Sequence, residues 1–157
     1  MDGDEYFYPV HMENIGCFFD QFEHADGVAV SWCIYGSSDR VVRPRNTTVE
    51  AFRAHSTTEL GDNSLVKSFV RPEKLGPNYT DPHRFDIPEE RYVDTKGQQV
   101  VWNGAIKNID WDDAKILHYI CRSMEHYIQR IKRRINADLG DSQVYWNHCL
   151  CQRETSP

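Results

Sequence analysis

The sequence predicts an α/β domain in which helices flank a mixed β-sheet. A helical apolar pattern over residues 14–26 precedes a β-rich run at 28–35, and a second strand-like run at 115–121 precedes a helical pattern at 123–139. Hydrophobic residues make up 39% of the chain and aromatic residues 12%, which is enough to build a buried core. We therefore expect a single domain over residues 1–157.

The composition argues against several classes of protein. The net charge of −6 gives no support for a nucleic-acid partner, which would require a basic face. No apolar run approaches the roughly 20 residues that cross a bilayer, and residues 1–10 carry no positively charged leader. Five cysteines at irregular spacing indicate reduced thiols rather than a disulfide framework. These features predict a cytoplasmic protein, with peripheral association with a membrane as the alternative.

The chain opens with an acidic stretch, Asp2-Gly3-Asp4-Glu5-Tyr6-Phe7. Two carboxylates one residue apart suit Mg²⁺ or Mn²⁺, because these cations prefer oxygen ligands and keep places for water and substrate phosphates. A solvated chain end explains the same residues without any ligand.

A helix and a strand are expected next. Asn14 can cap the helix and Gly27 is placed to end it. The apolar stripe of this helix consists of Ile15, Phe18, Phe19 and Phe22. The strand at 28–35 has Trp32 on its apolar face, where a tryptophan usually belongs to the core. A turn at 36–39 ends the strand.

Residues 40–109 are expected to form short elements and loops. A strand at 65–72 carries Lys67 and Arg71 on the same face, where they either lie in solvent or neutralise phosphate. The other elements expected here are a helix at 49–54, a loop at 61–64, and short strands near 91–94 and 98–102. His83 falls in the loop region, where a histidine is usually exposed.

The last third combines an acidic loop at 110–113, the strand at 115–121 and the second helix. Ser123 is a natural N-cap for this helix, and Gly140 can close it. Its basic residues gather in the C-terminal half, where the helix dipole favours cations. We interpret them as a solvated face, with contact to a membrane surface as the alternative.

Several segments, in the same order along the chain, resemble family-2-like glycosyltransferases of the GT-A type. The acidic stretch resembles the Asp-x-Asp-Glu-Phe-Leu motif of that family, and Trp32-Cys33-Ile34-Tyr35-Gly36-Ser37 resembles its Trp-x-x-Phe-Gly-Ser segment. Residues 67–72 resemble its Lys-Ser-Ile-Val-Arg-Pro segment. Residues 118–130 resemble its Asn-His-Tyr-x-x-Lys-Ser block, with Leu117 in place of Asn and Arg122 in place of Lys.

The resemblance implies part of a GT-A-like, Rossmann-like mixed sheet whose N-terminal nucleotide-binding half is missing. The chain would then be the C-terminal part of a catalytic domain, and we expect the activity to belong to a longer parent. Its expected parts are the metal motif, helix and strand (1–40), a strand and loop region for the acceptor (41–109), the His-Tyr strand and helix (110–140) and a tail (141–157).

The activity that the resemblance implies is metal-dependent transfer of a sugar from a nucleotide-sugar donor to a glycan or lipid-linked hydroxyl acceptor. Asp2, Asp4 and His118 would hold Mn²⁺ or Mg²⁺, although His118 can also be a core histidine. Asp39 is the candidate for the catalytic base, with Glu50 as its competitor. The expected substrate-binding residues are Glu5, Trp32, Gly36, Lys67, Arg71, His83, Tyr119, Arg122 and Ser123.

Two other functions compete with this one. Asp2 and Asp4 could open a haloacid-dehalogenase-type phosphatase, with Asp2 as the nucleophile and Asp112-Asp113 as the later acidic pair. The chain could instead be a non-catalytic carbohydrate-binding or adaptor module that uses its aromatic surface.

Overall fold

The computed structural model describes residues 1–79, 81–101 and 105–135. These residues divide into two compact units. Unit 1 consists of Met1–Cys33 and Leu60–Leu117. Unit 2 consists of Ile34–Glu59 and the described residues from His118 onward.

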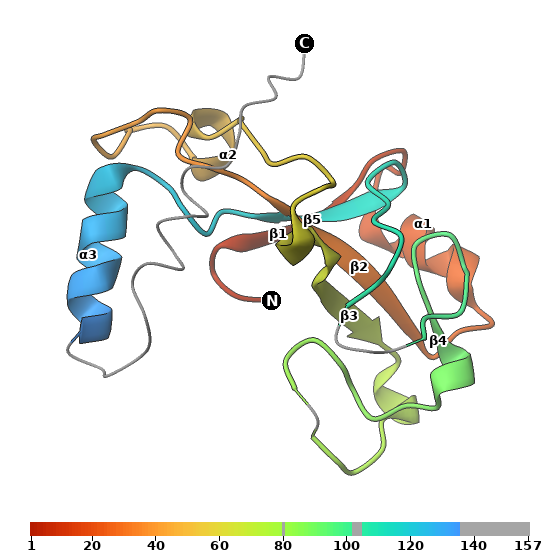
Figure 1. Ribbon diagram of the computed structural model, residues 1–157. Coiled ribbons are helices and arrows are strands. Elements are labelled where there is room, and N and C mark those ends of the chain that lie inside the picture. Colours follow the sequence, from red (N-terminus) through yellow and green to blue (C-terminus); the bar gives the residue numbers. More distant parts are fainter. Residues whose placement is uncertain (80, 102–104, 136–157) are drawn as a thin grey trace. The chain divides into compact units, whose positions relative to one another are not determined.

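A five-stranded mixed sheet forms the centre of the fold (Figure 1). The strands are β1 (Glu5–Pro9), β2 (Gly27–Ile34), β3 (Val66–Val70), β4 (Tyr92–Val93) and β5 (Ala114–His118). Their order is β1-β5-β2-β3, and β4 also pairs with β2. Strand β2 runs antiparallel to β3 and parallel to β4, so the expected α/β class with a mixed sheet is confirmed.

Strand β2 is the central strand, and all eight of its residues are buried. It lies between β5 and β3, with both faces covered, which explains why its sequence is an almost continuous apolar run. The strand predicted at 28–35 is therefore confirmed. Its pairing with β3 places Val30 opposite Lys67.

The first helix is shorter than expected. Helix α1 spans Ile15–Phe19 and continues as a 3₁₀ turn over Asp20–Phe22, whereas the sequence predicts a helix to residue 26. Asn14 caps it as expected, since its Oδ1 accepts a hydrogen bond from the backbone N–H of Cys17 at 3.0 Å. Gly27 does not end the helix but begins β2, where an added Cβ atom would clash with Ile87 Cδ1.

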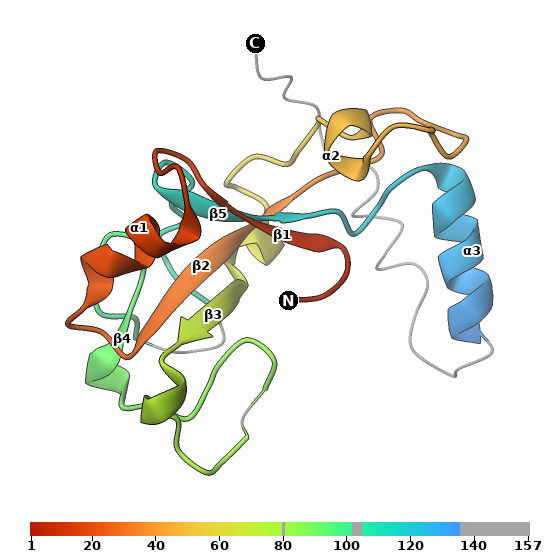
Figure 2. The same ribbon diagram turned by 180° about the vertical axis from the view of Figure 1, so that it is seen from behind.

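Aromatic side chains of β1, α1 and β3 pack together in one cluster. The ring of Phe7 on β1 lies 5.3 Å from Phe18 and 4.9 Å from Phe69 on β3, measured between ring centroids. Phe19 lies 4.8 Å from Phe69, and Phe18 lies 5.2 Å from Phe22. Figure 2 shows α1 and β1 from the side on which they are nearest the viewer. This cluster packs Phe7, at the end of the acidic stretch, against Phe69 of β3.

The other elements of unit 1 follow the prediction in position but not in length. Strand β3 is shorter than 65–72, and Pro72 stops it by opening a 3₁₀ turn. Strand β4 covers two residues of the predicted 91–94. The strand near 98–102 is reduced, in its described part, to a single bridge between Val93 and Gln99. Strand β5 ends at His118, earlier than the predicted residue 121.

Unit 2 contains two helices. Helix α2 (Thr48–Ala51) begins with a capping box formed by Thr47 and Glu50. Helix α3 (Met124–Ile135) is capped by Ser123, as expected, because its Oγ accepts from the N–H of His126 at 3.3 Å. The predicted continuation to 139, Gly140 and the tail at 141–157 lie outside the described residues.

Two findings bear on the cell-biological expectations. No helix among the described residues combines the length and hydropathy needed to cross a membrane.

Cys17 and Cys33 are free thiols, and burial raises the pKa of Cys33 to about 12. Cys121, by contrast, is disulfide-bonded, so the expectation of reduced thiols is wrong for this residue.

Candidate functional site

The acidic stretch forms a turn that leads into β1. The N–H of Glu5 donates to the carbonyl of Asp2 at 3.1 Å, and the N–H of Asp2 donates to the Glu5 carboxylate at 2.9 Å. These two hydrogen bonds link Asp2 and Glu5 to each other and so fix the conformation of the turn. The carboxylate of Asp2 stays exposed, whereas the side chain of Glu5 is fully buried.

Lys67 on β3 joins this turn and completes a small ionic cluster. Its Nζ lies 3.1 Å from Asp2 Oδ2 and 3.4 Å from Glu5 Oε2. Lys67 is only 6% exposed, so its ammonium group is largely removed from water and depends on these carboxylates. The structure therefore brings together three of the predicted site residues, Asp2, Glu5 and Lys67. We call them the acid–lysine cluster.

One atom of the acid–lysine cluster has no hydrogen-bond partner. The second carboxylate oxygen of Glu5, Oε1, is buried and accepts no hydrogen bond. A buried carboxylate oxygen without a donor is costly, because it loses its hydration without replacement. A cation or a hydroxyl donor placed beside this oxygen would remove that cost.

The residues of the cluster offer the hard oxygen donors that Mg²⁺ and Mn²⁺ prefer. The described part of the chain contains no set of three His, Cys, Asp or Glu side chains arranged to hold a metal ion. Two carboxylates are enough where substrate phosphates and water supply the other ligands. A cation bound beside Glu5 would also lie near the Lys67 ammonium group, 3.4 Å from Glu5 Oε2, so the exposed carboxylate of Asp2 is the more accessible donor.

The other predicted ligand and the predicted bases belong to unit 2. His118 is buried at the end of β5, and its carbonyl accepts from the N–H of Tyr35 at 2.9 Å. Asp39 is exposed in the expected turn, with a φ of +59°. Glu50 is occupied by the capping box of α2, where its carboxylate accepts from the N–H of Thr47. The roles of His118 and Asp39 stay predictions.

Arg71 does not share the surroundings of Lys67. Its Nε donates to the carbonyl of Ala25 at 3.1 Å and its Nη2 to that of Phe22 at 3.5 Å. Arg71 therefore secures the chain between the 3₁₀ turn and β2. This structural use differs from the phosphate or acceptor contact expected for it.

Trp32 and His83 lie together beside β3. Trp32 is buried, and its ring centroid lies 5.3 Å from that of His83. His83 Nδ1 lies 2.7 Å from the carbonyl oxygen of Val66, and the Ser68 hydroxyl donates to the His83 carbonyl. Because a carbonyl only accepts, Nδ1 is the donor in this contact. His83 is thus a fixed, half-buried imidazole rather than an exposed loop residue.

Four predicted substrate-binding residues belong to unit 2. Tyr119 is buried, with its ring 4.7 Å from that of Tyr35, and Ser123 is used as the helix cap. The N–H of Gly36 donates to the carbonyl of Ala54 at 2.9 Å. These three have structural uses. Arg122 differs, because its buried Nε has no hydrogen-bond partner.

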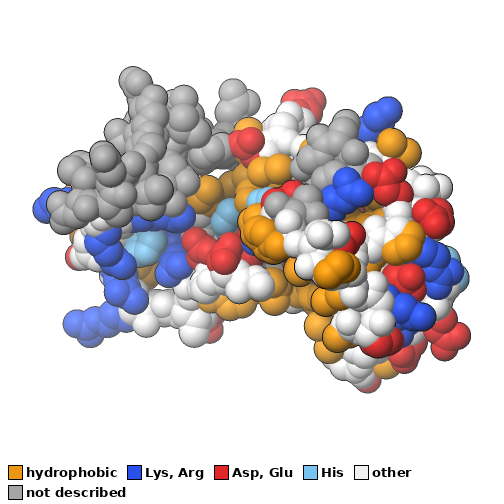
Figure 3. All heavy atoms as spheres, turned by 90° about the horizontal axis from the view of Figure 1, so that it is seen from below, with side chains coloured by type: hydrophobic (Ala, Val, Ile, Leu, Met, Phe, Trp, Pro, Cys, Tyr) orange, Lys and Arg blue, Asp and Glu red, His pale blue; other side chains and the backbone are white. Residues whose placement is uncertain are grey.

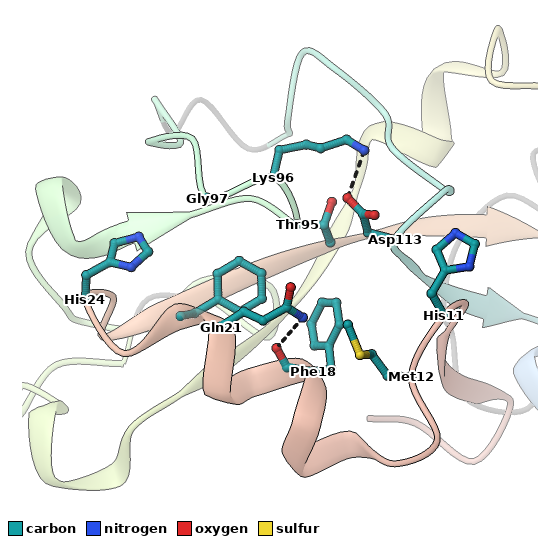
Figure 4. A pocket seen from close by; sticks show the side chains of 10 residues that line it. His11, Met12, Phe18, Gln21, His24, Thr95, Lys96, Gly97 and Asp113 are labelled. Carbon is teal, nitrogen blue, oxygen red and sulfur yellow. Dashed lines mark hydrogen bonds and ion pairs between the residues drawn. The ribbon is translucent and has the colours of Figure 1, made fainter.

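A separate pocket of about 290 Å³ lies in unit 1 among residues that the sequence analysis does not single out (Figure 4). His11 and His24 stand at its two ends. Lys96 projects over it and pairs with Asp113 at 2.8 Å and with Asp110 at 3.4 Å. Since the charge of Lys96 is neutralised by two carboxylates, the pocket suits a neutral, hydrogen-bonding ligand better than an ion.

Sequence reasoning missed the pairings rather than the residue types. Lys67 and Glu5 are 62 positions apart, and no local pattern links them. His126 was also missed, although its spacing of four residues from Arg122 and from Arg130 is visible in the sequence.

No family model, curated protein or solved structure matches this chain.

Proposed function

We propose that this chain takes part in metal-dependent transfer of a sugar from a nucleotide-sugar donor to a hydroxyl acceptor. The observation that carries the proposal is the acid–lysine cluster, in which Glu5 Oε1 is buried without a donor beside Asp2 and Lys67. The ordered resemblance to GT-A-type glycosyltransferases supplies the reaction, and a GT-A-like arrangement of the sheet is part of the same proposal.

The acid–lysine cluster would hold the donor through its diphosphate. Asp2 of the cluster and its neighbour Asp4 would supply carboxylates to Mn²⁺ or Mg²⁺, and the metal would provide Lewis-acid stabilisation of the diphosphate. Asp2 is exposed and so is accessible to a ligand, whereas Glu5 is buried and fixes the turn. Lys67 is paired with Asp2 and Glu5, so its charge holds the turn in place against β3 and does not by itself attract a further anion.

A second group suited to proton transfer is His83. Its Nδ1–H is held by the Val66 carbonyl, so its Nε2 can accept the proton of an acceptor hydroxyl. Its half-buried position against Trp32 fixes the ring plane. We propose His83 as a candidate base beside Asp39, whose place in the reaction rests on sequence position alone.

Isothermal titration of the longer parent protein with Mn²⁺ and a panel of sugar nucleotides tests the proposal, because the nucleotide-binding half is expected there. We expect nucleotide binding that requires Mn²⁺ and that Asp4→Asn weakens by about tenfold or more, since a charged ligand contact is lost. Asp112→Asn is the matched control, because Asp112 is an exposed acid of the 110–113 loop. Its binding should stay within about twofold of the wild type.

The other possible results separate the competing functions. Release of inorganic phosphate from a phosphomonoester, abolished by Asp2→Asn, would replace the proposal with a phosphatase. Binding of glycans without nucleotide or metal would replace it with a carbohydrate-binding module. Equal weakening by Asp4→Asn and Asp112→Asn would also contradict it, because the effect would then be one of net charge.

A further inference from the structure

Unit 2 is basic although the whole chain is acidic. Residues 34–59 and 118–135 contain nine Lys and Arg side chains (four and five) against four Asp and Glu (three and one). The net charge of the chain is −6, so unit 2 reverses the sign. Figure 3 shows Lys and Arg side chains, with a histidine among them, at the left of the view, where α3 lies.

These cations are concentrated on one side of α3. His126, Arg130 and Arg133 follow one another at intervals of four and three residues, which places them on the same side of the helix. Arg122 lies just before the cap residue Ser123, and its charge acts on His126. Arg130 is held in place because its Nη1 donates to the carbonyl of Ile120 at 2.9 Å.

A loop brings one more arginine to the start of this helix. The N–H groups of Met124 and Glu125 donate to the carbonyls of Arg40 and Val41 at 3.1 and 2.9 Å. The N–H of Arg43 in turn donates to the carboxylate of Glu125 at 2.8 Å. Two segments far apart in the sequence thus meet at the first turn of α3, and Arg43 joins the cations there.

Two polar atoms of this group are buried and have no hydrogen-bond partner, namely Arg122 Nε and His126 Nδ1. Within the described residues, moreover, Arg43, Arg122 and Arg133 form no ion pair with a carboxylate. The two buried atoms are costly to leave without a partner, whereas Arg43 and Arg133 are exposed and hydrated. An anion that accepts several hydrogen bonds would satisfy the buried atoms and would lie beside the exposed cations.

The electrostatics agree with this geometry. Burial lowers the pKa of His126 below its ordinary value of 6.5, and the charges of Arg122, Arg130, Arg133 and Arg43 lower it further. The imidazole therefore experiences a positive field from two segments of the chain, which the nearby carboxylate of Glu125 does not cancel.

We propose that Arg43, Arg122, His126 and Arg133 form a site for a phosphate group of a ligand. The planar guanidinium groups match the oxygens of a phosphate, and the imidazole adds a further donor. The site lies entirely within unit 2 and requires no metal. It is therefore independent of the acid–lysine cluster, and either proposal can fail alone.

The phosphate can belong to a small diphosphate-bearing molecule or to a lipid headgroup, and one experiment covers both sources. Titration calorimetry of the full chain with inorganic pyrophosphate, without metal and at low salt, measures the first. Flotation with vesicles of phosphatidylcholine, with and without phosphatidic acid, measures the second. We expect Arg122→Gln to weaken binding by about tenfold or more, as expected for loss of a charge-assisted hydrogen bond.

The matched control is Arg53→Gln, because Arg53 is an exposed arginine of unit 2 that is not among the residues acting on His126. We expect it to change binding by less than about twofold. Circular dichroism checks that both variants are folded. Removal of Arg122 leaves no broken hydrogen bond at its Nε, so the fold should persist.

A second readout follows the site directly. Pyrophosphate should raise the pKa of His126 in an NMR titration, because a nearby anion stabilises the imidazolium ion. Binding of pyrophosphate with this change supports a soluble phosphate ligand, and binding only to vesicles with phosphatidic acid supports a lipid headgroup. No binding to either overturns the proposal, as does equal weakening by Arg122→Gln and Arg53→Gln.

Discussion

The acid–lysine cluster makes a quantitative prediction for Lys67→Met. The ammonium group is the only cation within 4 Å of Glu5 in the described structure, and the Glu5 side chain has no exposed surface. Removing one partner of a buried ion pair leaves an uncompensated charge and costs about 3–5 kcal/mol. We therefore expect Lys67→Met to lower the free energy of unfolding by about that amount, measured by urea denaturation at pH 7.

Two further variants give this prediction its controls. Lys96→Met removes a lysine that is 45% exposed at its side chain, and an exposed pair contributes only about 0–1 kcal/mol. The double variant Glu5→Leu, Lys67→Met replaces the buried pair with apolar side chains and should recover most of the lost stability. A loss for Lys67→Met no larger than for Lys96→Met, or no recovery in the double variant, would refute the reasoning.

Three other predictions follow. Gly27→Ala should lower the free energy of unfolding by about 1–3 kcal/mol, because the added Cβ would clash with Ile87 Cδ1. Adding Ile87→Val should recover part of this loss, because valine lacks that atom. Additive losses in the double variant would contradict the prediction. His83→Gln should lower the rate of sugar transfer by about 10²-fold or more while leaving nucleotide affinity unchanged, and an equal loss of both would argue for a structural role. Hydrogen bonds from Arg91 lower the pKa of Asp26 below its ordinary value of 3.8, so the stabilisation that they give the folded protein is present above pH 3.8 and is lost as the pH falls through the lowered pKa. The variant Asp26→Asn should therefore lose less stability than the wild type when the pH is lowered through this range. An unchanged dependence of the unfolding free energy on acid pH would contradict this prediction.

The sequence predicted the central strand and the helix caps because their signals are local, whereas it did not predict strand β1. The apolar run of β2, the cap at Asn14 and the cap at Ser123 each depend on neighbouring residues, and the structure has all three. The predicted end of the first helix was wrong because packing between distant residues, rather than local sequence, decides the role of Gly27. Gly27 resembles a helix stop in sequence, but its small size is needed to pack against Ile87.

The candidate site could be predicted only as separate residues. The pattern indicated a role for Glu5 and Lys67, but their ion pair depends on how β1 and β3 are placed in the sheet. Arg71 shows the opposite case, since a cation expected to bind ligand instead binds the carbonyls of Phe22 and Ala25. Local periodicity does not reveal which donors and acceptors the fold leaves for a side chain.

The basic side of α3 illustrates the same limit. The spacing of Arg122, His126 and Arg130 is visible in the sequence, and it indicated a solvated or dipole-compensating face. The burial of Arg122 Nε and His126 Nδ1 without partners appears only in the structure. Lys132 and Arg133 are exposed, as a solvated face requires, and the two buried atoms are the reason for proposing a binding site beside them.

The central claim is that the acidic turn binds a divalent cation together with a nucleotide diphosphate. The most direct test is paramagnetic broadening by Mn²⁺ in two-dimensional NMR spectra of the full chain with a nucleotide diphosphate present. We predict selective loss of the amide signals of Asp4, Glu5, Tyr6 and Lys67, and their return in Asp4→Asn. Broadening that leaves these four signals intact, or that persists in the variant, would contradict the account.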